Sequence, residues 1–166
     1  MAVVEFARNV CGLKADSIET NPDSENLVID ILPEQKNVSQ KGGTMRLGAY
    51  KAVLSDSKVR KIYGSDAVFE RHRHRYEVNP KYHEVLQDNG LVFSGMSEDG
   101  RLVEFIELPN HSFFIGTQSH PEFKSNLLSP SPLFNSFVEA CLNMKEEQGG
   151  EDSVEGISEE ARVEKS

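Results

Sequence analysis

The sequence has no tryptophan and only two cysteines, Cys11 and Cys141, among its 166 residues. Two cysteines are too few for a disulfide framework or a zinc site of paired cysteines, so both are expected to be buried thiols in a reducing compartment. No run of about 18 apolar residues occurs, which excludes a membrane span, and no secretory leader is recognisable. The sequence also has no excess of basic charge. Its net charge of −9 argues against nucleic-acid binding.

The negative charge is concentrated at the end of the chain. Residues 145–166 contain eight acidic and three basic side chains and no aromatic residue. Such a segment cannot bury enough apolar surface to offset the entropy of ordering it. We therefore predict one folded body at 1–144 and an acidic disordered tail at 145–166, for which an interaction role stays open.

The body contains apolar segments of both helical and strand type. A helix is predicted over residues 2–13, where one narrow polar stripe leaves most sides apolar and buried. This helix has no capping residue and no lead-in, which is expected of a fragment that lacks a preceding strand, or of a small variant domain. A helix is predicted at 57–63, with Ser57 as its cap and Gly64 as its stop, and another at 80–89. The last predicted helix, 132–142, is amphipathic, with Leu133, Phe134, Phe137, Val138 and Cys141 on its apolar side. Strands are predicted at 27–32, 49–54, 68–78, 91–97, 102–108 and 113–117. The mixture indicates an α/β fold.

The most chemically suggestive segment is Gln118–Phe123, which directly follows the strand 113–117, expected to be buried because it is nearly all apolar. Proline after His120 disfavours helical geometry and extends the chain there. Side chains at i and i+2 of an extended chain share a face, so His120 and Glu122 are predicted to meet. Such a pair is the base and its orienting carboxylate in a nucleophilic triad, although a structural ion pair is the alternative.

Basic and aromatic side chains alternate along Glu70–Asn79. In an extended segment, arginines 71, 73 and 75 share one face and can bind a carboxylate or phosphate. A solvated edge strand is the alternative. Metal binding by His72 and His74 is disfavoured because the arginines beside them would repel a cation.

A glycine-rich segment, Gly42–Gly48, allows close approach of a ligand to the backbone, or forms a plain loop. It lacks the Lys-Ser/Thr pair of a nucleoside-triphosphate P-loop. Since the cysteines are too few and the His72–His74 pair is flanked by arginines, we expect no metal site on this chain.

In combination, these segments resemble the carboxy-terminal, class I glutamine amidotransferase part of the CTP synthase family. The resemblance covers most of 1–142 and is carried by the sequences AVVEFARNV (2–10), GGTMRLG (42–48), ERHRHRYEVN (70–79), VEFIELPNH (103–111) and QSHPEF (118–123). It implies a partial flavodoxin-like domain, a mixed open sheet flanked by helices, with the amino-terminal strands missing.

The resemblance also implies site residues. His120 and Glu122 match the histidine and glutamate of the family's Cys-His-Glu triad, and Glu19 and Arg75 match glutamine-binding residues. The family's nucleophilic cysteine precedes the segment that matches residue 2, so Cys11 is not expected to be the nucleophile and this chain is expected to be inactive alone.

For the complete enzyme, the resemblance implies glutamine hydrolysis that supplies ammonia for ATP-dependent amination of UTP to CTP. A separate synthase domain would bind UTP, ATP and Mg²⁺, GTP would act as activator near Gly42–Gly48, and the enzyme would be a cytoplasmic homotetramer. No cofactor is expected on this chain. The alternative is a free-standing, catalytically dead ligand-binding or regulatory protein.

Overall fold

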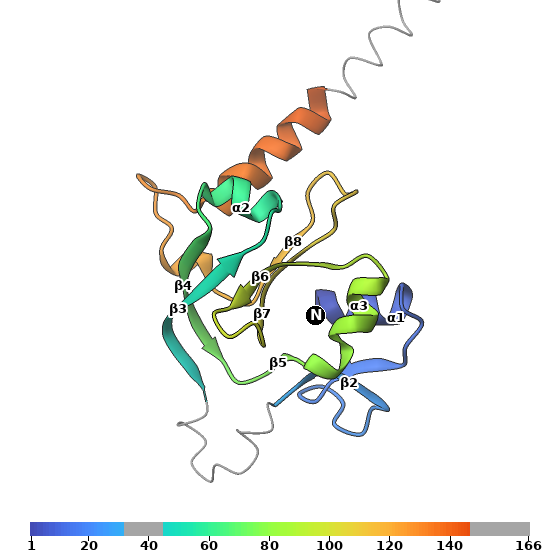
Figure 1. The fold of residues 1–166 in the computed structure, drawn as a ribbon. Coiled ribbons are helices and arrows are strands. Elements are labelled where there is room, and N and C mark those ends of the chain that lie inside the picture. Colours follow the sequence, from blue (N-terminus) through green and yellow to red (C-terminus); the bar gives the residue numbers. More distant parts are fainter. Residues whose placement is uncertain (32–44, 147–166) are drawn as a thin grey trace, which may run out of the picture.

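The computed structural model describes residues 1–31 and 45–146, which form two β-sheets and several helices (Figure 1). The smaller sheet has the order β1-β2-β5, in which β1 and β2 are parallel and β5 is antiparallel. The larger sheet has the order β4-β3-β6-β7-β8 and is antiparallel throughout. The strands are β1 (Ala15–Ser17), β2 (Asn26–Asp30), β3 (Arg46–Leu54), β4 (Ala67–His74), β5 (Glu77–Val78), β6 (Val92–Ser97), β7 (Val103–Glu107) and β8 (Ile115–Thr117).

The α/β class is confirmed, but the described residues form two sheets where the family resemblance implied one mixed open sheet. The division arises within the predicted strand 68–78. The chain ends β4 at His74, passes through Arg75 and Tyr76 outside either sheet, and joins the smaller sheet as β5. Side chains at this passage therefore lie at the junction of the two sheets.

The helices are α1 (Ala2–Asn9), α2 (Lys58–Tyr63) and α3 (His83–Asp88), with 3₁₀ turns at η2 (Pro80–Tyr82) and η3 (Pro121–Phe123) and a further helix over residues 132–146. Local signals set α2 as predicted. Ser57 Oγ accepts a hydrogen bond from the Arg60 backbone N–H, and Gly64 ends the helix at a φ of 63°. The buried carboxylate of Glu107 on β7 also accepts from the first two helical N–H groups, those of Lys58 and Val59.

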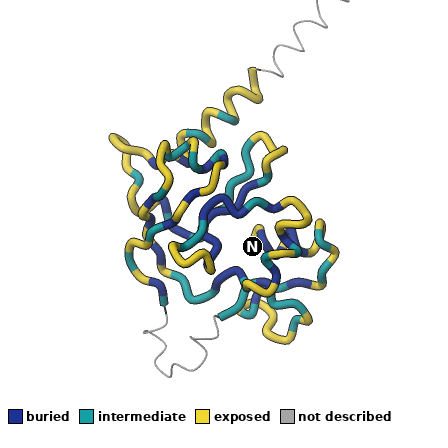
Figure 2. The backbone as a smooth tube through the Cα atoms, in the orientation of Figure 1, coloured by how far each residue is buried: buried dark blue, intermediate teal, exposed yellow. Residues whose placement is uncertain are grey.

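The apolar core has two clusters of buried residues. Figure 2 shows the buried parts of the backbone, in dark blue, gathered towards the centre of the molecule. The larger cluster joins α1 and α3 to the strands of both sheets, and includes Val4, Val28, Leu86 and Leu91. The smaller cluster lies under α2 around Phe105. The two sheets are thus fixed to each other through the larger cluster.

Several predictions of burial are wrong. The helix predicted over 2–13 ends at Asn9, and Val10 just beyond it is 52% exposed. The apolar stretch 113–117 was expected to be a buried strand, but β8 is only partly buried because it lies at the edge of the larger sheet.

The last helix is longer and more exposed than predicted. Residues 132–146 are helical, so residues 145 and 146 belong to this helix, while residues 147–166 of the predicted tail lie outside the described residues. Leu133 is buried, but Phe134, Phe137 and Val138 on the predicted apolar side are exposed. Figure 1 shows this helix extending away from the sheets, so most of its apolar side faces solvent. Over residues 1–31 and 45–146, no helix is long and apolar enough to cross a membrane.

Candidate active site

His120 and Glu122 are in direct contact, as the sequence predicted. His120 is extended, with φ −109° and ψ 83°, and its Nδ1 lies 2.6 Å from Oε1 of Glu122. The pKa of Glu122 is lowered, because hydrogen bonds from its own backbone N–H and from His120 outweigh the opposing effect of desolvation. A carboxylate on Nδ1 fixes that nitrogen as the protonated one and leaves Nε2 to exchange a proton.

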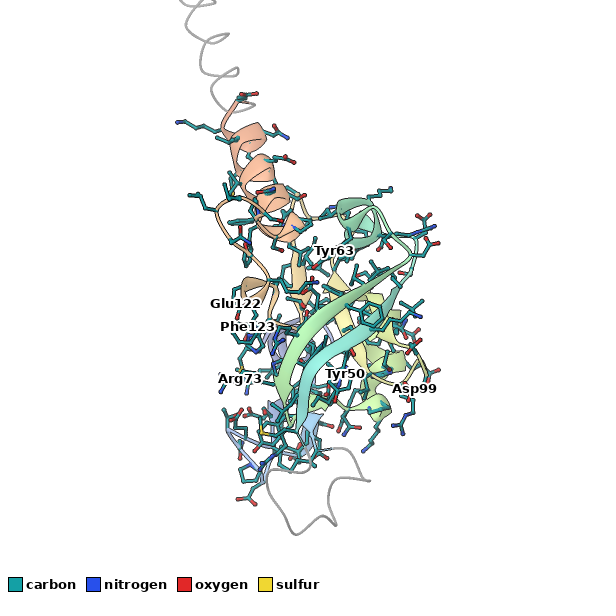
Figure 3. All side chains as sticks on the ribbon, turned by 90° about the vertical axis from the view of Figure 1, so that its left-hand side faces the viewer. Tyr50, Tyr63, Arg73, Asp99, Glu122 and Phe123 are labelled. Atoms are coloured by element: carbon teal, nitrogen blue, oxygen red, sulfur yellow. The ribbon has the colours of Figure 1, made fainter. Side chains whose placement is uncertain are left out.

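Three further contacts hold His120. Its backbone N–H donates to the Arg71 carbonyl at 2.8 Å, which ties the segment after β8 to the edge strand β4. Its ring stacks on His74 with a centroid distance of 4.8 Å and an interplanar angle of 1°, and on Phe123 at 4.8 Å and 22°. Figure 3 shows Glu122 and Phe123 beside β4, with Arg73 lower on the same side of the molecule.

A pocket of about 550 Å³ lies where the two sheets meet. Its walls come from both sheets and from the passage between β4 and β5. The lining residues are Met1, Ser17, Glu19, Ile29, Met45, Arg73, His74, Arg75, Tyr76 and Gln118. Glu19 and Arg75, which are 56 positions apart in the sequence, thus line the same cavity.

The charges in this pocket suit a zwitterionic amino acid. Glu19 supplies one carboxylate, which can bind an α-ammonium group, and Arg73 and Arg75 supply guanidinium groups for an α-carboxylate. Arg73 is exposed on β4, so the predicted alternation of β4 is confirmed, with Glu70 and His72 buried and Arg71 and Arg73 outward. The edge-strand alternative is also confirmed, since β4 ends the larger sheet.

His74 connects the pocket to the His-Glu pair, since it lines the pocket and stacks on His120. Burial, followed by the positive charges around it, lowers its pKa to about 4, so this ring is neutral at pH 7. His120 and Glu122 themselves do not line the pocket.

Behind the pocket wall lies a buried charged cluster that the sequence did not predict. Arg46 contacts Glu77 at 3.3 Å and Glu104 at 2.5 Å, and its guanidinium lies 4.6 Å from the Tyr50 ring centroid. His72 Nε2 lies 3.3 Å from Oε2 of Glu104. Glu77 also accepts a hydrogen bond from Gln118, a pocket residue, so the cluster supports the pocket from behind.

Burial shifts the protonation of this cluster. Desolvation raises the pKa of Glu77 to about 7, against the opposing effect of Arg46, and desolvation also raises the pKa of Glu104. Burial and then the charge of Arg46 lower the pKa of His72 to about 3. Because the folded protein keeps the His72 ring neutral, acid that protonates this ring in the unfolded chain lowers the free energy of unfolding.

We expect His72 to make the fold sensitive to acid. The folded-state pKa lies below the unfolded value near 6.5, so only the unfolded chain takes up this proton as the pH falls from 6.5 towards 3. Between pH 7 and 4.5 the His72 contribution to this loss should be roughly 2 kcal/mol. The change in the free energy of unfolding should therefore differ by about that amount between wild type and His72→Gln, while His74 and Glu77, whose pKa values are also shifted, titrate in both proteins. Urea unfolding at both pH values measures it, with the exposed His111→Gln as control; equal pH dependence in wild type and His72→Gln would contradict this.

The comparisons with known proteins agree with this geometry. The family model described as "Glutamine amidotransferase class-I" matches residues 1–140. The chain belongs to the class I glutamine amidotransferase family. It is 60% identical over 142 residues to the CTP synthase of Methanococcus maripaludis, which covers 85% of this chain, and 55% identical over 146 residues to that of Saccharolobus solfataricus. The chain spans 27% of the length of each of these relatives.

A solved structure gives the same assignment. The glutaminase domain of Trypanosoma brucei CTPS with bound acivicin superposes with a TM-score of 0.78 at 40% identity. The match covers 86% of this chain and 56% of that domain. Within the class I amidotransferases, the chain is therefore a homologue of the CTP synthase amidotransferase domain.

Cys11 of this amidotransferase homologue lies in surroundings that disfavour the reactive thiolate. Cys11 Sγ lies 3.8 Å from the Val85 carbonyl oxygen, and desolvation raises its pKa. A raised pKa disfavours the reactive thiolate. Cys141 is exposed on the helix of residues 132–146 and Cys11 is only partly buried, so the prediction that both thiols are buried is wrong.

We therefore expect the purified 166-residue chain to release no ammonia from glutamine above the rate without protein. A coupled glutamate dehydrogenase assay measures it, with Cys11→Ala as the matched variant. Ammonia release that disappears in Cys11→Ala would show that Cys11 is a nucleophile after all.

No group of three or more His, Cys, Asp or Glu side chains within the described residues is arranged to hold a metal ion. The nucleotide-activation prediction for Gly42–Gly48 rests mainly on residues up to 44, which lie outside those described. The sequence named Arg73 among three arginines that can bind a carboxylate, and the structure places it in the pocket. It did not single out His74 or Gln118 as pocket residues, and the alternation along Glu70–Asn79 was the available signal for His74.

Proposed function

We propose that this chain is the glutaminase part of a CTP synthase, which hydrolyses glutamine and supplies ammonia for the ATP-dependent amination of UTP to CTP. One observation carries the proposal: a pocket with one carboxylate and two guanidinium groups adjoins, through His74, a histidine whose Nδ1 is held by a carboxylate. The CTP synthases to which the chain is similar support the same reaction.

His120 and Glu122 have separate tasks in this proposal. Glu122 accepts the Nδ1–H hydrogen bond and stabilises the imidazolium form. Nε2 takes the proton of a cysteine thiol as the sulfur attacks the glutamine amide carbon, and returns it to the departing nitrogen as ammonia leaves. Water then releases glutamate from the thioester, again with His120 as the base.

Glu19 and Arg75 bind glutamine in this proposal. Arg75, with Arg73 beside it, takes the α-carboxylate, and Glu19 takes the α-ammonium group. With the α-carboxylate and α-ammonium group held in this way, the side-chain amide of glutamine is oriented for attack. In this proposal the nucleophilic cysteine and the further strands of a flavodoxin-like sheet belong to another part of the complete glutaminase domain. The match to 56% of the trypanosomal protein leaves room for such a part.

The same proposal includes the partners of the complete enzyme. A synthase domain binds UTP, ATP and Mg²⁺, GTP activates the glutaminase, and the enzyme assembles as a homotetramer in the cytoplasm. The length of the related CTP synthases, of which this chain spans 27%, leaves room for that domain. A catalytically dead regulatory protein is less well supported, because such a protein has no use for a carboxylate-oriented histidine.

Arg75→Ala tests the binding assignment. We expect glutamine use in a complete CTP synthase carrying this segment to weaken by the loss of a charge-assisted contact, roughly 1.5–3 kcal/mol or about 10- to 150-fold in kcat/KM. The loss should appear mainly in KM, and ammonia-dependent CTP formation should be unchanged.

Arg71→Ala is the matched control, because Arg71 is exposed on β4 but does not line the pocket. It should leave both activities near wild type. An equal loss of glutamine use in both variants would refute the specific role of Arg75 and leave only a general effect of surface charge.

A further inference from the structure

The restraints on His120 are unequal. Glu122, which contacts Nδ1, is 52% exposed, and Phe123 is 49% exposed on the same short turn, η3. Both lie within three residues of His120, so they move with the segment that carries it. His74 instead belongs to β4, which pairs with β3 along eight residues from Ala67 to His74.

The contact between the two rings is geometrically well defined. The planes of His74 and His120 differ by 1° with centroids 4.8 Å apart, within the range for offset stacking. The Arg71 carbonyl on the same strand accepts the His120 backbone N–H at 2.8 Å. The strand therefore fixes both the backbone and the ring plane of His120.

We propose that His74 is a positioning residue: its ring holds the His120 imidazole in the orientation in which Nδ1 faces Glu122, leaving Nε2 to exchange the proton. This role rests on the proposed glutaminase function, in which His120 is the base. The test is independent of that function, because the orientation of the His120 ring can be measured in the chain without substrate.

The surroundings of His74 fit this role. Its ring meets the edge of His72 at 5.6 Å on the side of the buried cluster. The titratable and charged groups that act on it are His120, Arg46, Arg73 and Glu122. A neutral His74 places no charge against His120 when that ring takes up a proton. Because His74 also lines the pocket, a bound substrate touches the residue that orients the base.

The experiment compares His74→Leu with His74→Phe in the 166-residue chain labelled with ¹⁵N-histidine. Both side chains are apolar and of similar bulk, but only phenylalanine keeps a flat ring. Long-range ¹H–¹⁵N correlation at about pH 8, where an ordinary imidazole is neutral, shows which ring nitrogen of His120 carries the proton. His111→Gln, an exposed histidine outside this cluster, serves for assignment and as control.

In wild type and in His74→Phe we expect His120 to be mainly in the Nδ1–H form. In His74→Leu the ratio of the Nδ1–H to the Nε2–H form should fall by about 2- to 12-fold, the range of a lost aromatic stack. An unchanged ratio in a folded His74→Leu, or an equal fall in His74→Phe, overturns the proposal. A purely structural role would lower the melting temperature without changing the ratio.

Phe123→Leu keeps the test decisive if His74→Leu does not fold, because Phe123 is half-exposed and its replacement should be tolerated. In this variant the stack on His74 should be enough to orient the His120 ring, so His120 should stay mainly in the Nδ1–H form. A mixed-tautomer His120 in Phe123→Leu would assign the positioning to Phe123 and overturn the role of His74. If the proposed glutaminase function were wrong, only assays with glutamine would show it, because the tautomer measurement contains no substrate.

Discussion

His120→Ala should abolish glutamine-dependent CTP formation while ammonia-dependent formation persists. The protein to use is a chimera in which this chain replaces the 142 aligned residues of the Methanococcus maripaludis CTP synthase. We expect a fall of ~10³-fold or more, because members of a catalytic triad act as a unit and loss of the base forfeits most of the rate. Ammonia added directly bypasses glutamine hydrolysis, so that reaction does not need Nε2.

The control is His111→Ala, which removes an exposed histidine and should leave both activities near wild type. The two nitrogen sources are measured on the same preparation by following CTP absorbance. If His120→Ala removed both activities equally in a folded protein, His120 would serve domain coupling or architecture. The interpretation of Gln118–Phe123 as half of a triad would then be wrong.

Arg46→Met should destabilise the fold by about 3–5 kcal/mol at pH 7, because it leaves two buried carboxylates without their cation. Glu77 and Glu104 have side chains that are 1% and 0% exposed, and both contact the Arg46 guanidinium. Urea unfolding of the 166-residue chain measures the change. Acid should reduce the deficit, since the raised pKa of Glu77, about 7, lets that carboxylate take up a proton first.

Lys51→Met provides the matched control. Lys51 contacts Glu98 at 2.8 Å, but both side chains are solvent-accessible, so its loss should cost less than about 1 kcal/mol. Replacing Glu77 and Glu104 by glutamine in the Arg46→Met background should restore part of the stability, because the uncompensated charge is then removed. A deficit under 1 kcal/mol in Arg46→Met would show that water reaches the cluster.

Features set by neighbouring residues were predictable from the sequence. Ser57 and Gly64 bound α2 because a capping hydroxyl and a left-handed glycine act within one turn of the helix. The contact of His120 with Glu122 follows from a proline and a spacing of two. The burial alternation of β4 follows from the two-residue period of a strand.

Features that join distant segments were not predictable from those rules. The Arg46 cluster joins positions 31 and 58 residues apart, and the stack of His74 on His120 joins positions 46 apart. The resemblance to a family named Glu19 and Arg75, but only the meeting of two sheets brings them to one pocket. The helix predicted over 132–142 forms, but whether its apolar side is buried also depends on a distant segment, and in the structure that side is mostly exposed.

The sequence by itself determined the α/β class, the bounds of α2, the His120–Glu122 pair and which side of the last helix is apolar. The tertiary structure alone decided that β4 and β5 belong to different sheets, that Arg46 is buried between two carboxylates, and that Phe134, Phe137 and Val138 face solvent. Periodicity and capping are properties of one segment. Burial and pairing depend on which other segment lies against it, and that is settled only when the whole chain packs.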